Sequence, residues 1–141
     1  MWSYLWPILL IVTANVIYNI TTKSTPAAAS PFLALTVTYL SGAVLSFAIY
    51  IFAVPERRLV TDLLALNWTS YALAASIVGL EVGYIYLYRA GWKLNAGSLT
   101  ANILLALALI AVGALFYRET LTLRQAAGVI LCIGGLALLN L

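Results

Sequence analysis

The chain has 141 residues, of which 65% are hydrophobic and 8% are charged, and its formal net charge is +3. This composition excludes a soluble domain, because too few polar residues are present to cover its surface, and it indicates an integral membrane protein. A chain with no histidine and one cysteine, Cys132, also offers no metal cluster and no disulfide framework. A glycine-rich phosphate loop with its lysine is missing from the sequence, so we expect no ATP and no other cofactor.

Five apolar runs of roughly 17 to 24 residues follow one another along the chain, each long enough for a helix to cross a hydrocarbon core of about 30 Å. They lack the alternation of barrel strands, so an all-α transmembrane bundle is predicted. The predicted helices lie at about 2–22, 31–54, 68–88, 96–117 and 124–141. Their short links make consecutive helices antiparallel neighbours within a single domain, 1–141.

Polar residues recur at helical spacing in the first and fourth of these helices. Asn15, Tyr18 and Asn19 share one face of the first helix, and Asn95, Ser98 and Asn102 share one face of the fourth. Amides inside lipid need a partner or water, so these side chains either line a substrate pathway or form hydrogen bonds between helices. We take Asn15, Tyr18, Asn19 and Asn102 as candidate binding residues; Asn95 fits a helix start.

The third helix carries one acid, Glu81, in the stretch "VGLEVGYIYLYRAG". A charged acid within a span costs about 2.5–3.5 kcal/mol on insertion scales and therefore faces a cavity or a partner. Tyr84 and Tyr88 follow on the same helical face, and an acid beside two aromatic rings suits a cation. Glu81 is thus a candidate site for protons and a cationic or zwitterionic substrate; the alternative is a packing role, neutralised by hydrogen bonds or by Arg89.

The last helix has a narrow stripe of small residues, Gly128, Cys132 and Gly135. Small residues spaced in this way let another helix approach closely. The stripe is a candidate packing surface, either inside one bundle or between two copies of the chain.

The basic residues give little preference for one orientation in the membrane. Loops on the side of the amino terminus carry Arg57, Arg58, Arg118 and Arg124, and the opposite loops carry Lys23, Arg89 and Lys93. This near balance leaves two readings open: a single orientation, or insertion both ways up. Two copies inserted in opposite senses would form ten helices related by an axis in the membrane plane, the inverted-repeat plan of many secondary transporters.

The segment from residue 95 onward resembles the end of an EamA-type half of the drug/metabolite transporter superfamily. The matching residues are Glu119, Leu121, Thr122 and Gln125 of an E-x-L-T-x-x-Q loop, followed by Gly128, Gly134 and Gly135. The terminal "GVILCIGGLALLNL" also resembles the last helix of the small multidrug resistance proteins. Those proteins hold their coupling glutamate in the first helix, which contains no acid in this chain.

The resemblance implies a transporter of small organic molecules that works as a dimer. With an odd number of spans and nearly balanced basic residues we expect an antiparallel homodimer, and the compact loops suit a bacterial inner membrane. Small molecules, protons and the lipid bilayer are the expected partners, and the charge gives no reason to expect nucleic acid. A translocator of lipids or lipid-linked sugars, or a non-transporting subunit of a larger complex, remains as an alternative. An enzyme is not expected, because a single buried acid has no nucleophile, base or metal beside it.

Overall fold

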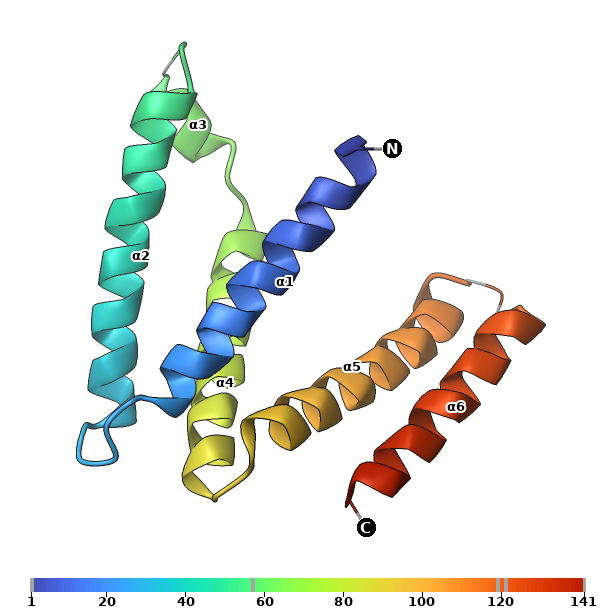
Figure 1. Cartoon of the computed structure of the whole chain (residues 1–141). Coiled ribbons are helices and arrows are strands. Elements are labelled where there is room, and N and C mark those ends of the chain that lie inside the picture. The colour runs from blue at the N-terminus through green and yellow to red at the C-terminus, as the bar shows by residue number, and fades with distance from the viewer. Residues whose placement is uncertain (1, 57, 119, 121, 141) are drawn as a thin grey trace. The chain divides into compact units, whose positions relative to one another are not determined.

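The computed structural model describes residues 2–56, 58–118, 120 and 122–140, and every regular element among them is a helix (Figure 1). The helices are α1 (Trp2–Lys23), α2 (Pro31–Ala53), α3 (Leu59–Leu64), α4 (Trp68–Arg89), α5 (Leu94–Phe116) and α6 (Leu123–Asn140). The prediction of an all-α membrane protein is confirmed for this part of the chain. Arg57, Glu119 and Leu121, used above, lie outside the described residues.

Four helices, α1, α2, α4 and α5, are long and apolar enough to cross a membrane. Helix α6 has 18 residues, a length of about 27 Å, but its side chains are described without a gap only over Leu123–Gly135, which is shorter than a membrane span. A fifth crossing therefore stays a prediction. The short helix α3 lies within the longest predicted link and was not expected, because six residues are too few to show a hydrophobic period.

Local chemistry explains where three of the helices begin. Pro31 occupies the first turn of α2, where its missing N–H costs no hydrogen bond. Before α4, the Asn67 side-chain oxygen accepts a hydrogen bond from the Thr69 backbone N–H at 3.0 Å. Before α6, the Gln125 side chain accepts a bond from the Thr122 N–H at 2.9 Å, and the Thr122 hydroxyl accepts one from the Gln125 N–H at 3.3 Å. The T-x-x-Q part of the loop motif is thus a capping box.

The chain divides into two compact units, one formed by Met1–Ile20 with Ala90–Leu141 and the other by Thr21–Arg89. In the second unit α2 packs against α4, and the two helices run in opposite directions (Figure 1). Its most buried apolar side chains are Leu35 of α2, 5% exposed, and Ile85 and Tyr88 of α4, 4% and 8% exposed. The core of this unit therefore lies towards the end of α4 and the beginning of α2.

Two cations of the second unit hold the connection between α1 and α2 against the end of α4. The Arg89 guanidinium donates hydrogen bonds to the carbonyl oxygens of Pro26 at 3.3 Å and Ala29 at 2.8 Å. The Lys23 ammonium lies 5.7 Å from the centre of the Tyr88 ring, within the range of a cation–π interaction. The connection is short, but these contacts give it a defined place on α4.

The first unit contains most of α1 together with α5 and α6. Helices α5 and α6 pack against each other and run in opposite directions (Figure 1). Gly91, in the turn before α5, has a φ of +94°, a left-handed conformation that glycine adopts without strain. Gly97 and Gly113 are buried on α5. This unit positions the polar faces of α1 and α5 that were identified in the sequence.

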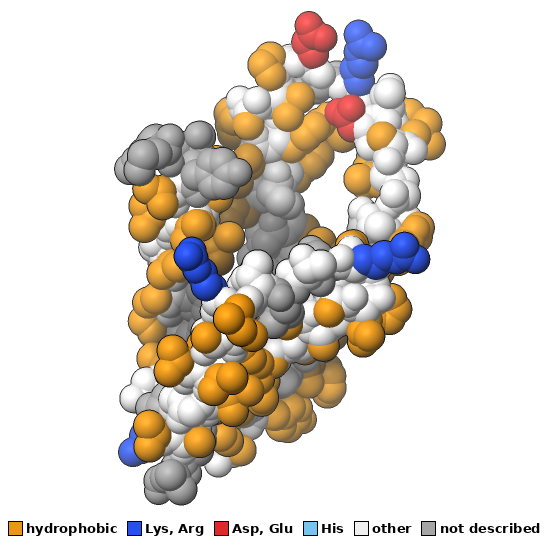
Figure 2. Space-filling view, turned by 90° about the vertical axis from the view of Figure 1, so that its right-hand side faces the viewer, with side chains coloured by type: hydrophobic (Ala, Val, Ile, Leu, Met, Phe, Trp, Pro, Cys, Tyr) orange, Lys and Arg blue, Asp and Glu red, His pale blue; other side chains and the backbone are white. Residues whose placement is uncertain are grey.

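Large apolar side chains are exposed along the helices of both units. Phe52 of α2 is 90% exposed and Leu131 of α6 is 76% exposed. Figure 2 shows hydrophobic side chains spread over the face in view, whereas charged side chains are few. A water-soluble protein rarely exposes apolar surface on this scale, whereas a lipid bilayer covers it.

Candidate functional site

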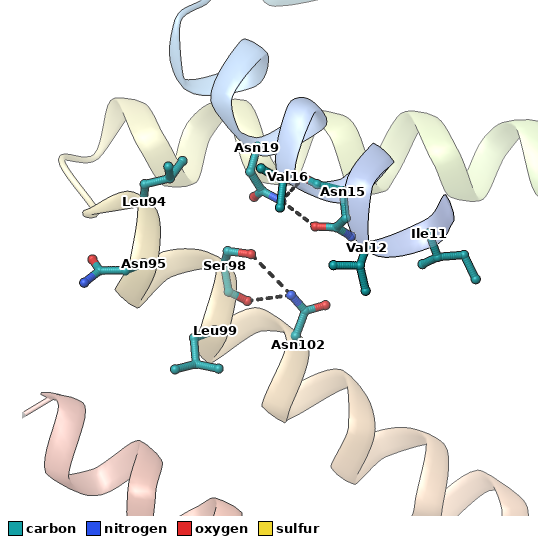
Figure 3. A pocket seen from close by; sticks show the side chains of 10 residues that line it. All are labelled: Ile11, Val12, Asn15, Val16, Asn19, Leu94, Asn95, Ser98, Leu99 and Asn102. Atoms are coloured by element: carbon teal, nitrogen blue, oxygen red, sulfur yellow. Dashed lines mark hydrogen bonds between the residues drawn. The ribbon is translucent and has the colours of Figure 1, made fainter. Parts of the chain in front are cut away.

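A cavity of about 570 Å³ lies in the first unit between α1 and α5 (Figure 3). Its apolar lining comes from aliphatic residues of both helices, including Val12, Val16 and Leu99. Its polar lining consists of Asn15, Asn19, Asn95, Ser98 and Asn102. A cavity with an aliphatic wall and a few converging polar groups is the usual form of a small-molecule site.

The two amides of α1 are joined to each other. Asn15 and Asn19 are four residues apart and therefore lie on the same face of the helix. The Asn19 Nδ2 group donates to the Asn15 side-chain oxygen at 2.6 Å and to the Asn15 backbone oxygen at 2.8 Å. Asn19 is 5% exposed, whereas Asn15 is open to the cavity. The buried amide therefore holds the exposed one in place.

Helix α5 repeats this arrangement with a different pair. The Asn102 Nδ2 group donates to the Ser98 backbone oxygen at 2.8 Å and to the Ser98 hydroxyl at 3.3 Å. Both bonds are drawn in Figure 3, on the side of the cavity opposite α1. Asn95 uses its side-chain oxygen to accept a bond from the Ala96 N–H at 2.9 Å, as expected near a helix start. Asn102 is therefore the α5 amide whose remaining oxygen is available to a ligand.

The structure groups some of the predicted binding residues and separates others. Asn15, Asn19 and Asn102 line the same cavity. Tyr18 is half-buried on α1 but does not belong to the lining. Glu81, Tyr84 and Tyr88 all lie on α4, in the other unit. The polar positions read from the sequence therefore form two regions, which we call the amide cavity (Asn15, Asn19, Ser98 and Asn102) and the Glu81 face (Glu81, Tyr84 and Tyr88).

On the Glu81 face, the acid is half-buried and follows an exposed stretch of α4. The Tyr84 and Tyr88 rings lie 6.1 Å apart between centres, at an interplanar angle of 35°. Tyr39 of α2 lies close enough to Glu81 for a Coulombic interaction between them. Its hydroxyl oxygen is buried and has no hydrogen-bond partner among the described residues. An acid, two rings and a buried phenol thus occur together on the packed pair α2 and α4.

Arg89 bears on the alternative in which Glu81 only fixes packing. The contacts that the structure describes for its guanidinium are those to the carbonyl oxygens of Pro26 and Ala29. Because the Arg89 guanidinium is bonded to the connection between α1 and α2, it does not serve as the partner that would neutralise Glu81. The packing alternative then depends on hydrogen bonds to the acid.

The small residues of α6 face open space in the single chain. A Cβ atom built on Gly128 or Gly135 would meet no other atom within 4 Å. Gly128 and Cys132 line a groove of about 350 Å³ between α6 and α5, whose other residues are mostly aliphatic. Close packing within the described part of this chain therefore does not explain the glycines.

Sequence reasoning missed Tyr39 of α2 as a neighbour of the Glu81 face, because the relative register of two packed helices cannot be read from hydropathy. The available signal was a tyrosine near the middle of a largely apolar run. Among the residues that the structure describes, no group of histidine, cysteine, aspartate or glutamate side chains could hold a metal ion.

The sequence matches the model of the EamA-like transporter family over residues 2–141. Comparisons with curated proteins and with solved structures gave no match. The family match covers the two regions described above, since both lie within its span.

Proposed function

The chain belongs to the EamA-like transporter family, and we propose that it is a secondary transporter of small organic molecules with the amide cavity as its substrate site. The observation that carries this proposal is the meeting of amides from two apolar helices, α1 and α5, around one cavity. Polar side chains within membrane spans are costly unless they face a cavity or one another. Here the amides face a cavity and are also bonded to other polar groups of their own helices, as a substrate pathway requires.

Glu81 is the proposed site of proton exchange. It is the acid of an apolar span, and Tyr84 and Tyr88 beside it supply ring faces that attract a positive group. Protonation removes the negative charge that a cationic or zwitterionic substrate needs. A proton and a cationic or zwitterionic substrate therefore occupy the transporter in turn, and this mutual exclusion couples their opposite fluxes.

The proposed assembly is an antiparallel homodimer in a bacterial inner membrane. Its support is the open face of α6, where Gly128 and Gly135 leave room for a helix of another chain. The near balance of basic residues between the two sides of the membrane is compatible with insertion in both orientations. Carboxyl-terminal tags that report cytoplasmic and external locations should both give signals; a signal on one side alone would contradict the antiparallel dimer.

Transport is tested with the purified full chain reconstituted into liposomes with an acidic lumen. Because protons and substrate move in opposite directions, substrate should accumulate in the acidic lumen as protons leave. A lumenal pH dye should then report a rise in pH. A panel of radiolabelled neutral, cationic and zwitterionic metabolites is screened in this way.

Liposomes without protein and liposomes carrying the double variant Asn15→Leu/Asn102→Leu provide the controls. The double variant removes the exposed amides from both walls of the cavity while keeping similar side-chain volumes. Uptake that is the same in this folded variant would remove the cavity from the pathway. Absence of flux for the whole panel, in the native chain, would contradict transport of such molecules.

A further inference from the structure

The hydrogen bonds inside the amide cavity determine which amide atoms remain for a ligand. On α1, the Asn15 side-chain oxygen already accepts a bond from Asn19. Among the described residues, Asn15 makes no further side-chain bond, so its Nδ2 group is the part that remains. Figure 3 shows this nitrogen on the side of Asn15 away from Asn19. Helix α1 therefore presents a hydrogen-bond donor to the cavity.

The opposite wall presents the complementary atom. Both bonds made by the Asn102 amide use its Nδ2 group, which donates to Ser98. Its side-chain oxygen remains, and in Figure 3 this oxygen points away from Ser98. Because an amide oxygen can only accept, α5 presents an acceptor where α1 presents a donor. The cavity is thus asymmetric in its hydrogen-bonding groups.

The lining carries no formal charge in the part of the chain that the structure describes. An ion placed there would lose its hydration without meeting an opposite charge, which is strongly unfavourable in an apolar setting. A neutral group that accepts one bond and donates another would satisfy both remaining amide atoms. At about 570 Å³, the cavity has room for a molecule the size of a small metabolite.

We infer that the amide cavity binds an uncharged group with adjacent acceptor and donor atoms, of which a carboxamide is the simplest example. The carboxamide oxygen accepts from Asn15 and its N–H donates to Asn102. This inference rests on the proposed function and narrows its substrate class. The expectation of a cationic substrate came from Glu81, which is not part of the cavity lining, so that charge preference does not extend to this site.

The test uses three compounds of nearly the same shape: nicotinamide, which is neutral, nicotinate, which is anionic, and 1-methylnicotinamide, which keeps the carboxamide but is cationic. A reporter thiol is introduced by Val12→Cys, at an exposed position in the cavity lining. The native thiol is removed by Cys132→Ser, because Cys132 is exposed. The full chain in lipid nanodiscs is then alkylated with N-ethylmaleimide in the presence of each compound.

Nicotinamide should protect the reporter at a concentration about tenfold lower than either charged compound, because charged analogues lose hydration without compensation. Asn15→Leu should abolish this protection. Asn15→Asp replaces the donor by a carboxylate and should shift the preference to 1-methylnicotinamide. Thr38→Val, an exposed change on α2 that also removes a hydroxyl bonded within its own helix, serves as the matched control and should leave protection unchanged.

Equal protection by all three compounds, a preference for a charged compound in the native cavity, or protection by none of them would each overturn the inference. Size-exclusion profiles and circular dichroism establish that each variant is folded. The liposome assay separates the two proposals. Flux of charged molecules alone would retain the transporter and reject the neutral site, whereas protection by nicotinamide without any flux would retain the site and reject transport.

Discussion

The amide cavity and the Glu81 face solve the same problem, polar groups inside apolar helices, in different ways. In the cavity, Asn19 and Asn102 each donate to a residue one turn earlier on their own helix, so each wall orders its amides locally and leaves one amide atom for a ligand. On the Glu81 face the acid lies on α4, and the nearby phenol of Tyr39 comes from α2. Neutral amides can be accommodated within one helix, whereas a carboxyl group depends on its neighbours. Our proposals therefore place substrate binding in the first region and proton exchange in the second.

The largest expected effect that would separate the two regions comes from Glu81→Gln. Glutamine keeps the shape of the side chain but cannot release a proton, so accumulation driven by a pH gradient should be lost. Protection of the Val12→Cys reporter by nicotinamide should be unchanged, because this neutral compound does not depend on the negative charge of Glu81. Counterflow without a gradient, measured in the same liposomes, shows whether the variant still binds substrate; gradient-driven accumulation that survives would remove Glu81 from coupling.

A smaller effect is expected from Asn19→Leu within the amide cavity. This change removes the donor that holds the Asn15 oxygen, so the Asn15 amide can rotate and present either end to a ligand. Nicotinamide protection should weaken about threefold, in line with the loss of one neutral hydrogen bond. Thr13→Val, which removes a hydroxyl bonded within the same helix, is the control. A loss as complete as that of Asn15→Leu would instead indicate direct contact between Asn19 and the ligand.

The smallest expected effect concerns the folding stability of the second unit rather than either candidate site. Arg89→Gln removes a charged donor from the Pro26 and Ala29 carbonyls and should lower the free energy of unfolding by about 1 kcal/mol. The reduction is modest because Arg89 is exposed to solvent. Reversible unfolding in mixed micelles measures it against Lys93→Gln, which removes a loop cation with no side-chain capping bond. Equal stability of the two variants would show that the Arg89 hydrogen bonds to the Pro26 and Ala29 carbonyls contribute nothing to the free energy of unfolding.

Much of the helical layout follows from the sequence, because a helix must satisfy its backbone within lipid and so leaves long apolar runs. The predicted span at 68–88 compares with Trp68–Arg89 in the structure, and that at 96–117 with Leu94–Phe116. The side-by-side positions of Asn15 and Asn19, and of Ser98 and Asn102, follow from helical spacing alone. The start of α6 was also available in principle, since T-x-x-Q is a capping box as well as a family motif.

Relations between helices could not be obtained in this way. Periodicity places Asn15 and Asn102 on faces of their own helices, but not on opposite walls of one cavity. The relative position of Tyr39 and Glu81 likewise depends on the register between α2 and α4, which no local pattern encodes. Helix α3 was missed because its six residues, "LVTDLL", resemble the end of a link as much as a helix.

The bonds between Asn19 and Asn15 and between Asn102 and Ser98 also have an entropic consequence. A flexible side chain that becomes ordered on binding costs about 0.5–1.5 kcal/mol in lost rotamer freedom. The exposed amides of both walls are already ordered by their own helices before any ligand arrives. Much of that cost is therefore met during folding, so the ligand that we propose would retain most of the free energy of its two hydrogen bonds.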